Sequence, residues 1–216
     1  MAHRNGILGA ARVLSDHMGV VCPQDPTDLT RSNAASEGSL PRITEPSISH
    51  GKGANISEQG TSLHTASWAG DIETVRSLLD SGTDVNERDE HHRTPVYYAS
   101  WRGRVEAAKL LIEYGADVNS QDGTGWAPLH TASRNGHLDV VRLLLDHGVD
   151  VNAEMQDHWT ALHLASEDGN FEVVEALLKQ GANVGVRNDE GRTPSRVASR
   201  SGYRNIVRLL SEYDTT

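Results

Sequence analysis

The sequence has almost none of the features that mark a secreted or membrane protein. Its 216 residues include a single cysteine, Cys22, so an intrachain disulfide is impossible and a zinc site built from cysteines is not expected. No run of 18 apolar residues occurs, which excludes a membrane-spanning helix. Near the start there is only a short apolar stretch around residues 7–14, and Arg12 interrupts it, which is unlike a signal peptide. We therefore expect an intracellular protein, in the cytoplasm or the nucleus, without membrane contact.

Positive charge is also scarce. The chain carries 20 basic and 30 acidic residues, a net charge of −10, which argues against DNA or RNA coating because a basic face supplies most of that affinity. Residues 59–190 have a net charge of −12, whereas residues 191–216 have +3. Arginines recur there at intervals of four on both sides of Gly202, which predicts two basic patches: Arg192, Arg196, Arg200, Arg204 and Arg208. These patches could bind a phosphate or an acidic peptide, or form a solvated cap with cations at helix ends.

Aromatic residues are missing from the first 58 positions, although the chain has ten. Between residues 23 and 60, 17 of 38 residues are Gly, Pro, Ser or Thr, and no helical or strand period is visible. Such a segment buries too little apolar surface to offset the entropy lost on folding. We expect residues 1–58 to be mostly disordered, with a short helix near residues 7–14. The sequence of residues 53–56 is weakly similar to that of residues 82–85 and could be the remnant of an earlier repeat.

The rest of the chain is an internal repeat with a period of 33 residues. Three positions return five times at this interval without an insertion: Thr61, Thr94, Ala127, Thr160 and Thr193; Ala66, Ala99, Ala132, Ala165 and Ala198; Gly70, Gly103, Gly136, Gly169 and Gly202. A repeat of this length is typical of a solenoid. We place the units at about residues 59–91, 92–124, 125–157, 158–190 and 191–216.

The residue pattern of each unit predicts two short helices. A pair such as Thr94-Pro95 opens the first helix, since threonine caps a helix and proline fits its first turn. In the third unit this helix covers residues 129–135, and Gly136 ends it. The second helix has apolar residues at helical spacing: Leu138, Val141, Leu144 and Leu145. Gly148 then supplies a left-handed exit into the next turn.

The third and fourth units resemble ankyrin repeats. The segments that carry the resemblance are Ala127-Pro128-Leu129-His130-Thr131-Ala132, Gly136-His137-Leu138-Asp139-Val140-Val141 and Thr160-Ala161-Leu162-His163-Leu164-Ala165. The resemblance covers roughly residues 59–213 and implies an all-α fold. That fold is an ankyrin-repeat α-solenoid of helix–turn–helix pairs joined by β-turn fingers. In the last unit Arg204 and Ser211 occupy apolar slots, while Val207 and Leu210 keep the inner slots, so we expect the C-terminal cap there.

Catalysis is not expected, because a solenoid offers an extended surface without a deep cavity. No nucleophile, base or phosphate-binding loop can be placed in a pocket. His64, His130 and His163 share one repeat position, and the resemblance implies a structural role, with each ring bonded to the backbone of the turns. We expect no cofactor and no metal ion. Serines at another repeat position should allow close helix packing and bond back to the preceding turn: Ser67, Ser100, Ser133, Ser166 and Ser199.

Tryptophan and arginine mark the expected binding face. Trp68 and Trp101 share one repeat position, and Trp126 and Trp159 share another. The resemblance implies that both positions line a concave face, and Trp, Tyr and Arg are enriched at interface hot spots. The alternative is that each tryptophan is a half-buried lid stacked on an arginine. On the first interpretation the partner-binding residues are Trp68, Arg93, Tyr98, Trp101, Arg102, Trp126, Arg134, Trp159, Arg192 and Arg200.

Asparagine ends a recurring Asp-Val-Asn segment in the first three units, at Asn86, Asn119 and Asn152. Repeats of this form resemble substrates of asparaginyl hydroxylases, which makes these residues possible hydroxylation sites. Alternatively, the asparagine only holds the turn through hydrogen bonds to the backbone.

The expected function is a non-catalytic protein–protein interaction module, a scaffold or adaptor that binds another protein as a monomer and binds no nucleic acid. Two alternatives stay open. One is a stoichiometric inhibitor or regulator of an enzyme or transcription factor, and the other is a fragment of a larger multidomain ankyrin protein.

Overall fold

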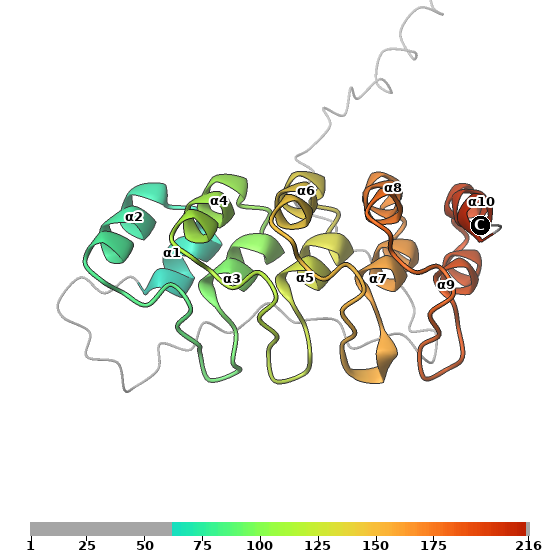
Figure 1. The fold of residues 1–216 in the computed structure, drawn as a ribbon, viewed down its shortest axis with the longest axis horizontal. Coiled ribbons are helices and arrows are strands. Elements are labelled where there is room, and N and C mark those ends of the chain that lie inside the picture. Colours follow the sequence, from blue (N-terminus) through green and yellow to red (C-terminus); the bar gives the residue numbers. More distant parts are fainter. Residues whose placement is uncertain (1–61, 215–216) are drawn as a thin grey trace, which may run out of the picture. The chain divides into compact units, whose positions relative to one another are not determined.

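The computed structural model describes residues 62–214, where the chain forms ten α-helices and one short 3-10 turn at Gln156–His158 (Figure 1). The α-helices are α1 (Leu63–Ala69), α2 (Ile72–Asp80), α3 (Pro95–Trp101), α4 (Val105–Glu113), α5 (Pro128–Arg134), α6 (Leu138–Asp146), α7 (Ala161–Asp168), α8 (Phe171–Lys179), α9 (Pro194–Ser201) and α10 (Arg204–Tyr213). The described range contains no strand, only an isolated β-bridge between Glu154 and Thr160. The predicted all-α repeat fold is therefore confirmed. The expected tail at residues 1–58, with its short helix and repeat remnant, lies outside the described residues.

The helices are arranged as five consecutive helix–turn–helix pairs. The first helices of the pairs (α1, α3, α5, α7 and α9) stand side by side in one row, and the second helices (α2, α4, α6, α8 and α10) form a second row (Figure 1). The loops that join successive pairs project away from the second row. We call these loops the fingers; they cover residues 81–94, 114–127, 147–160 and 180–193.

The first helices begin where the Thr-Pro pattern predicts. The hydroxyl groups of Thr160 and Thr193 accept hydrogen bonds from backbone N–H groups in the first turns of α7 and α9. Thr94 stands at the same position before α3, but its hydroxyl bonds instead to Ser120 Oγ, at 3.0 Å. Proline occupies the first position of α3, α5 and α9. The helix of the third unit thus starts one residue earlier than residues 129–135 would have it, at Pro128.

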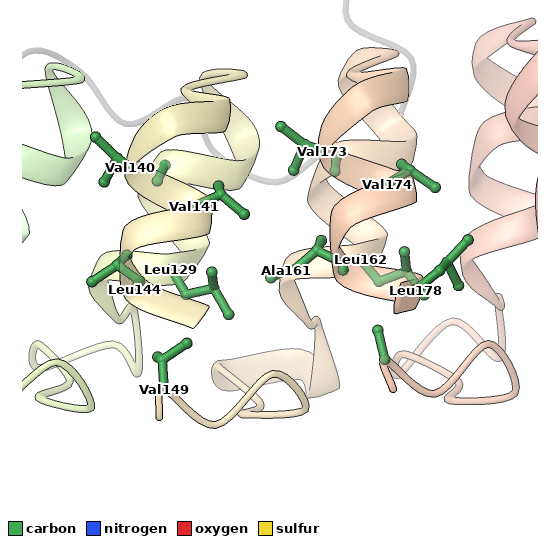
Figure 2. Packing of buried hydrophobic residues seen from close by; sticks show 14 of the residues in the cluster. Leu129, Val140, Val141, Leu144, Val149, Ala161, Leu162, Val173, Val174 and Leu178 are labelled. Atoms are coloured by element: carbon green, nitrogen blue, oxygen red, sulfur yellow. The ribbon is translucent and has the colours of Figure 1, made fainter. Parts of the chain in front are cut away.

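The second helices bury one face against the first row. In α6, Val141 and Leu144 are completely buried, while the predicted neighbours Leu138 and Leu145 are half-buried. Side chains of α6 and α8 meet those of the first helices in one continuous apolar layer (Figure 2). Burial of this layer supplies the main stabilisation of the array, because each pair is too short to be stable alone.

The second, third and fourth repeats each bond to the preceding repeat through the residue just before the second helix. Arg104 Nε donates to the carbonyl oxygen of Trp68 at 3.3 Å, and His137 Nε2 lies 3.0 Å from the carbonyl oxygen of Trp101. Asn170 Nδ2 donates to the carbonyl oxygens of Ser133 and Arg134. Three different side chains therefore satisfy the free carbonyl groups at the end of the previous first helix.

A glycine is required where these side chains cross to the preceding repeat. Gly103 has a φ of +65°, and a Cβ atom at this position would lie 2.6 Å from Nδ1 of His137. The same close approach recurs at Gly169, where a Cβ atom would lie 2.3 Å from the ring of Tyr203. The recurring glycine thus allows both a left-handed turn and contact between neighbouring repeats.

The fifth pair has the polar outer side expected of a cap. Arg204 and Ser211 of α10 are exposed, while Ile206 and Leu210 are buried. The second buried residue beside Leu210 is thus Ile206, and the predicted Val207 is half-buried. In residues 62–214, no helix is long and apolar enough to cross a membrane.

Candidate protein-binding face

Eight of the ten predicted binding residues lie on two repeat positions of the first helices and the fingers, while Tyr98 lies inside α3 and Arg102 directly follows it. One position ends the first helix and holds Trp68, Trp101, Arg134, Glu167 and Arg200. The other ends each finger and holds Arg93, Trp126, Trp159 and Arg192. Because the first helices stand side by side, each position forms a column that crosses the repeats (Figure 1). We call the surface formed by both columns the first-helix face.

The four tryptophans of the predicted binding face differ in burial. Trp126 and Trp159 are only 7% and 3% exposed. Their rings pack against His130 and His163 of their own repeats, at centroid distances of 6.3 and 5.6 Å. Tyr98, another predicted contact, is also buried. Of the four tryptophans, Trp68 and Trp101 alone are partly accessible to solvent.

Arginine side chains cover aromatic rings at three places on this face. The guanidinium carbon of Arg102 lies 4.6 Å from the ring centroid of Trp68, across the boundary between the first and second repeats. Arg134 lies 5.6 Å from the ring of Trp126, and Arg93 lies 5.8 Å from the ring of Tyr97. Two of the four tryptophans, Trp68 and Trp126, are thus stacked with an arginine in the described residues.

Arg93 belongs to a hydrogen-bonded cluster at the first finger. The hydroxyl of Tyr98 donates to Asp89 at 2.6 Å, and Arg93 Nη1 lies 3.5 Å from the same hydroxyl. Arg93 Nε also lies 3.8 Å from a carboxylate oxygen of Asp122. Burial and the bond to Asp89 raise the pKa of Tyr98 to about 12, so its hydroxyl stays protonated and can donate. The cluster fixes the finger against α3.

Arginines further along the face are also paired with carboxylates. Arg134 Nε lies 3.6 Å from Asp168, and Arg192 pairs with Glu190. Burial raises the pKa of Glu167, and the negative charge of Asp168 raises it further, against the opposing effect of Arg134. Arg200 is exposed at the end of α9. The face therefore becomes more acidic from α5 towards α7.

The recurring histidines have the structural role that the resemblance implies. Nδ1 of His130 accepts the N–H of Ala127, and Nε2 lies 2.9 Å from the carbonyl oxygen of Ala153. His163 makes the equivalent contacts with Thr160 and Arg192. Burial lowers the pKa of His130 to about 4, so its ring is neutral at physiological pH. In the described residues, no group of three or more His, Cys, Asp or Glu side chains could hold a metal ion.

The recurring asparagines connect successive fingers. Oδ1 of Asn86 accepts the N–H of Asp117 at 2.8 Å, and its Nδ2 donates to the carbonyl oxygen of Gly115. Asn119 and Asn152 accept equivalent bonds from Asp150 and Asn183. Each amide thus holds the backbone of the following repeat, as the structural interpretation predicts.

Two features of the surface differ from the sequence-based expectation. Four of the five serines at the recurring position are buried, and their hydroxyl groups find no hydrogen-bond partner in the described part of the chain, so they do not bond back to the preceding turn; they are Ser67, Ser100, Ser133 and Ser166. Arg104 and His137 were not predicted as surface residues of interest, yet they flank Trp68 and Trp101. The only signal for them was their shared repeat position, where residue type varies freely.

Comparison with known proteins agrees with this architecture. The family model described as "Ankyrin repeats (3 copies)" matches residues 32–122, 63–155, 121–188 and 153–216. No curated protein matches the chain at a significant level. The first match begins before the described residues, and the matches together span most of the sequence. With five helix pairs and this match, the chain belongs to the ankyrin repeat family.

Proposed function

We propose that this protein is a non-catalytic interaction module that binds another protein on its first-helix face. Ankyrin repeats generally serve as protein–protein interaction modules. A face built on packed helices changes little on binding, so little conformational entropy is lost on this side. The partner binds a monomer, and neither a cofactor nor nucleic acid takes part.

The observation that carries this proposal is the set of partly accessible aromatic and arginine side chains on adjacent repeats. Trp68 and Trp101 are half-buried, and Arg102 is exposed above Trp68. A rigid ring beside a guanidinium group offers apolar contact area together with directional hydrogen-bond donors. Three further predicted residues are buried: Trp126, Trp159 and Tyr98. The remaining arginines of the face are Arg93, Arg134, Arg192 and Arg200.

Affinity capture from a native cell extract tests this proposal with the full chain as bait. The test variant carries Trp68→Ala and Trp101→Ala. A matched control carries Arg142→Ala and Lys179→Ala, which change two exposed side chains of the second helices. Circular dichroism confirms the helicity of both variants before capture.

We expect partners that wild type and the control retain and that the test variant loses at least about tenfold, the change that follows from losing hot-spot contacts. Loss of the same partners in the control variant alone would place binding on the second-helix side. Retention by both variants would also contradict the proposed face. An activity assay of a captured partner, with and without this protein, separates a scaffold from a stoichiometric inhibitor, and native mass measurement tests the monomer.

A further inference from the structure

Four side chains from three consecutive repeats form one continuous patch, which we call the Trp68 patch: Trp68, Arg102, Arg104 and His137. Arg102 stacks on the ring of Trp68, and Arg104 Nε donates to the Trp68 carbonyl oxygen at 3.3 Å. His137 reaches the end of the same helix α3 that precedes Arg102, through the Trp101 carbonyl oxygen at 3.0 Å. The patch is thus held by contacts between repeats and does not depend on one mobile loop.

The patch is positive in an otherwise acidic array. Arg102 and Arg104 are both exposed, and neither forms an ion pair with a carboxylate of residues 62–214. The repeats around them, residues 59–190, carry a net charge of −12. Burial lowers the pKa of His137, and the positive charges of Arg102 and Arg104 lower it further, against the effect of the bond to Trp101. The positive charges of Arg102 and Arg104 therefore act on the His137 ring.

Three other arginines of the first-helix face already form ion pairs. Arg93, Arg134 and Arg192 face Asp122, Asp168 and Glu190. A carboxylate arriving from outside would have to displace an existing partner at those sites. At Arg102 the described residues 62–214 provide no such partner, and the ring of Trp68 holds the planar guanidinium group for a bidentate contact.

We propose that the Trp68 patch binds an acidic segment of the partner protein, with a glutamate or aspartate carboxylate on Arg102 and a neighbouring carboxylate on Arg104. This inference rests on the proposed function and names the chemistry of the partner. The strong negative charge elsewhere on the repeats repels a long polyanion, so a short acidic segment fits better than a nucleic acid. The same negative charge excludes non-matching acidic surfaces and so adds specificity.

Binding of deca-glutamate to the full chain tests this inference directly. Fluorescence anisotropy at low ionic strength measures its affinity for wild type, Arg102→Ala and Arg102→Lys. The matched control is Arg142→Ala, which removes an exposed arginine from α6. We expect Arg102→Ala to weaken binding by about tenfold, as expected for a lost charge-assisted hydrogen bond. Arg102→Lys should retain part of the affinity, and Arg142→Ala should leave it unchanged.

A second readout locates the peptide independently of any variant. A carboxylate beside Arg102 and Arg104 compensates their charge, so the pKa of His137 should rise when deca-glutamate binds, as followed by NMR of its ring. The rings of His147 and His158, elsewhere on the chain, serve as internal controls. Absence of binding, an unchanged pKa of His137, or equal binding by Arg102→Ala would overturn the inference. Binding of a phosphoserine peptide but not of deca-glutamate would overturn it in favour of a phosphate site.

Failure of this inference can be distinguished from failure of the proposed function. Partners captured by wild type and lost by Trp68→Ala/Trp101→Ala, but retained by Arg102→Glu, would leave the first-helix face as a binding site and remove only the acidic segment. Loss of those partners in Arg102→Glu, with thermal stability unchanged, would support both.

Discussion

Nδ1 of His64 lies 3.1 Å from a carboxylate oxygen of Glu87, whereas Nδ1 of the equivalent His130 faces a backbone N–H group. Nε2 of His64 lies 3.1 Å from two further acceptors, the carbonyl oxygens of Glu87 and Arg93. Both ring nitrogens of His64 therefore face acceptors, which an imidazolium satisfies and a neutral ring does not. The contacts at one repeat position thus raise the pKa of the histidine in the first unit, whereas burial lowers it in the third and fourth.

We predict that Glu87→Gln destabilises the array more at about pH 6 than at about pH 8.5. Burial lowers the pKa of His64, but the hydrogen bond and charge of Glu87, the Arg93 carbonyl and the charge of Asp89 outweigh it and raise the pKa. Tyr98 packs edge-on against the ring and is uncharged in this range. A raised folded pKa contributes stability that is complete below the unfolded value of about 6.5 and is lost as pH rises through the folded pKa. Urea unfolding at both pH values, with exposed Glu106→Gln as control, measures the difference; equal losses would contradict the prediction.

His130 should have the opposite pH dependence. Its folded pKa of about 4 lies below the unfolded value, so its contribution is present above about pH 6.5 and is lost as pH falls towards 4. The loss amounts to at most roughly 3 kcal/mol. NMR titration of the ring should give an apparent pKa near 4, and His130→Gln should flatten the stability profile between these pH values. A ring that titrates near 6.5 in the folded protein would refute this account.

Ser133→Ala is expected to stabilise the fold by about 1 kcal/mol, because its buried hydroxyl lacks a hydrogen-bond partner in the described residues. Ser199→Ala at the same repeat position is the control, since Ser199 is exposed. Both changes raise helix propensity equally, so the difference between their free energies of unfolding isolates the buried hydroxyl. A larger gain at Ser199 than at Ser133 would show that Ser133 is satisfied in solution.

His92→Gly should also stabilise the fold, by roughly 0.5 kcal/mol. His92 has a φ of +64° at the repeat position where Gly125 and Gly191 have φ values of +86° and +69°. Relief of the strained left-handed backbone exceeds the added entropy of a glycine in the unfolded chain. The neighbouring His91 lacks a positive φ, so His91→Gly should destabilise the fold. Thermal unfolding that ranks both variants alike would contradict this explanation.

Hydroxylation of Asn86, Asn119 or Asn152 is tested by peptide mass spectrometry of the protein purified from its own cells. Hydroxylation would add one oxygen atom to these peptides and none to the fourth-unit peptide, where Gly185 stands at the asparagine position. Their amides hold the following finger, so modified protein should retain the inter-repeat bonds through Oδ1. Peptides without the increment would leave these residues with a structural role alone.

The repeat length and helix pairs follow from the sequence because the same residues recur in the same local roles. Glycine, Thr-Pro and the apolar spacing each constrain the backbone without knowledge of distant residues. Burial at the first-helix face does not follow in this way. Arg93 and Trp126 share one repeat position, yet the ring of Trp126 is buried under Arg134 while Arg93 reaches Asp122. The burial of Trp126 and the ion pair of Arg93 both depend on side chains from other elements. Aligning the repeat sequences does not show which of these side chains lie close together.

Arg104 and His137 show the same limit more clearly. Each bonds to a carbonyl oxygen 36 residues earlier, and nothing local in the sequence indicates that contact. Because residue type varies at this position, no recurring motif draws attention to it. The Trp68 patch forms only where three folded repeats lie side by side.

The contacts from Arg104, His137 and Asn170 to the preceding repeat give the array a direction. Since each side chain reaches backwards, a repeat leaving the ribosome has unsatisfied carbonyl groups at the end of its first helix until the next repeat folds. Folding during synthesis should therefore lag one repeat behind the emerging chain. For the same reason, repeats cannot be exchanged freely by engineering: a transplanted unit must bring a donor suited to the repeat before it and a glycine that admits the donor from the repeat after it.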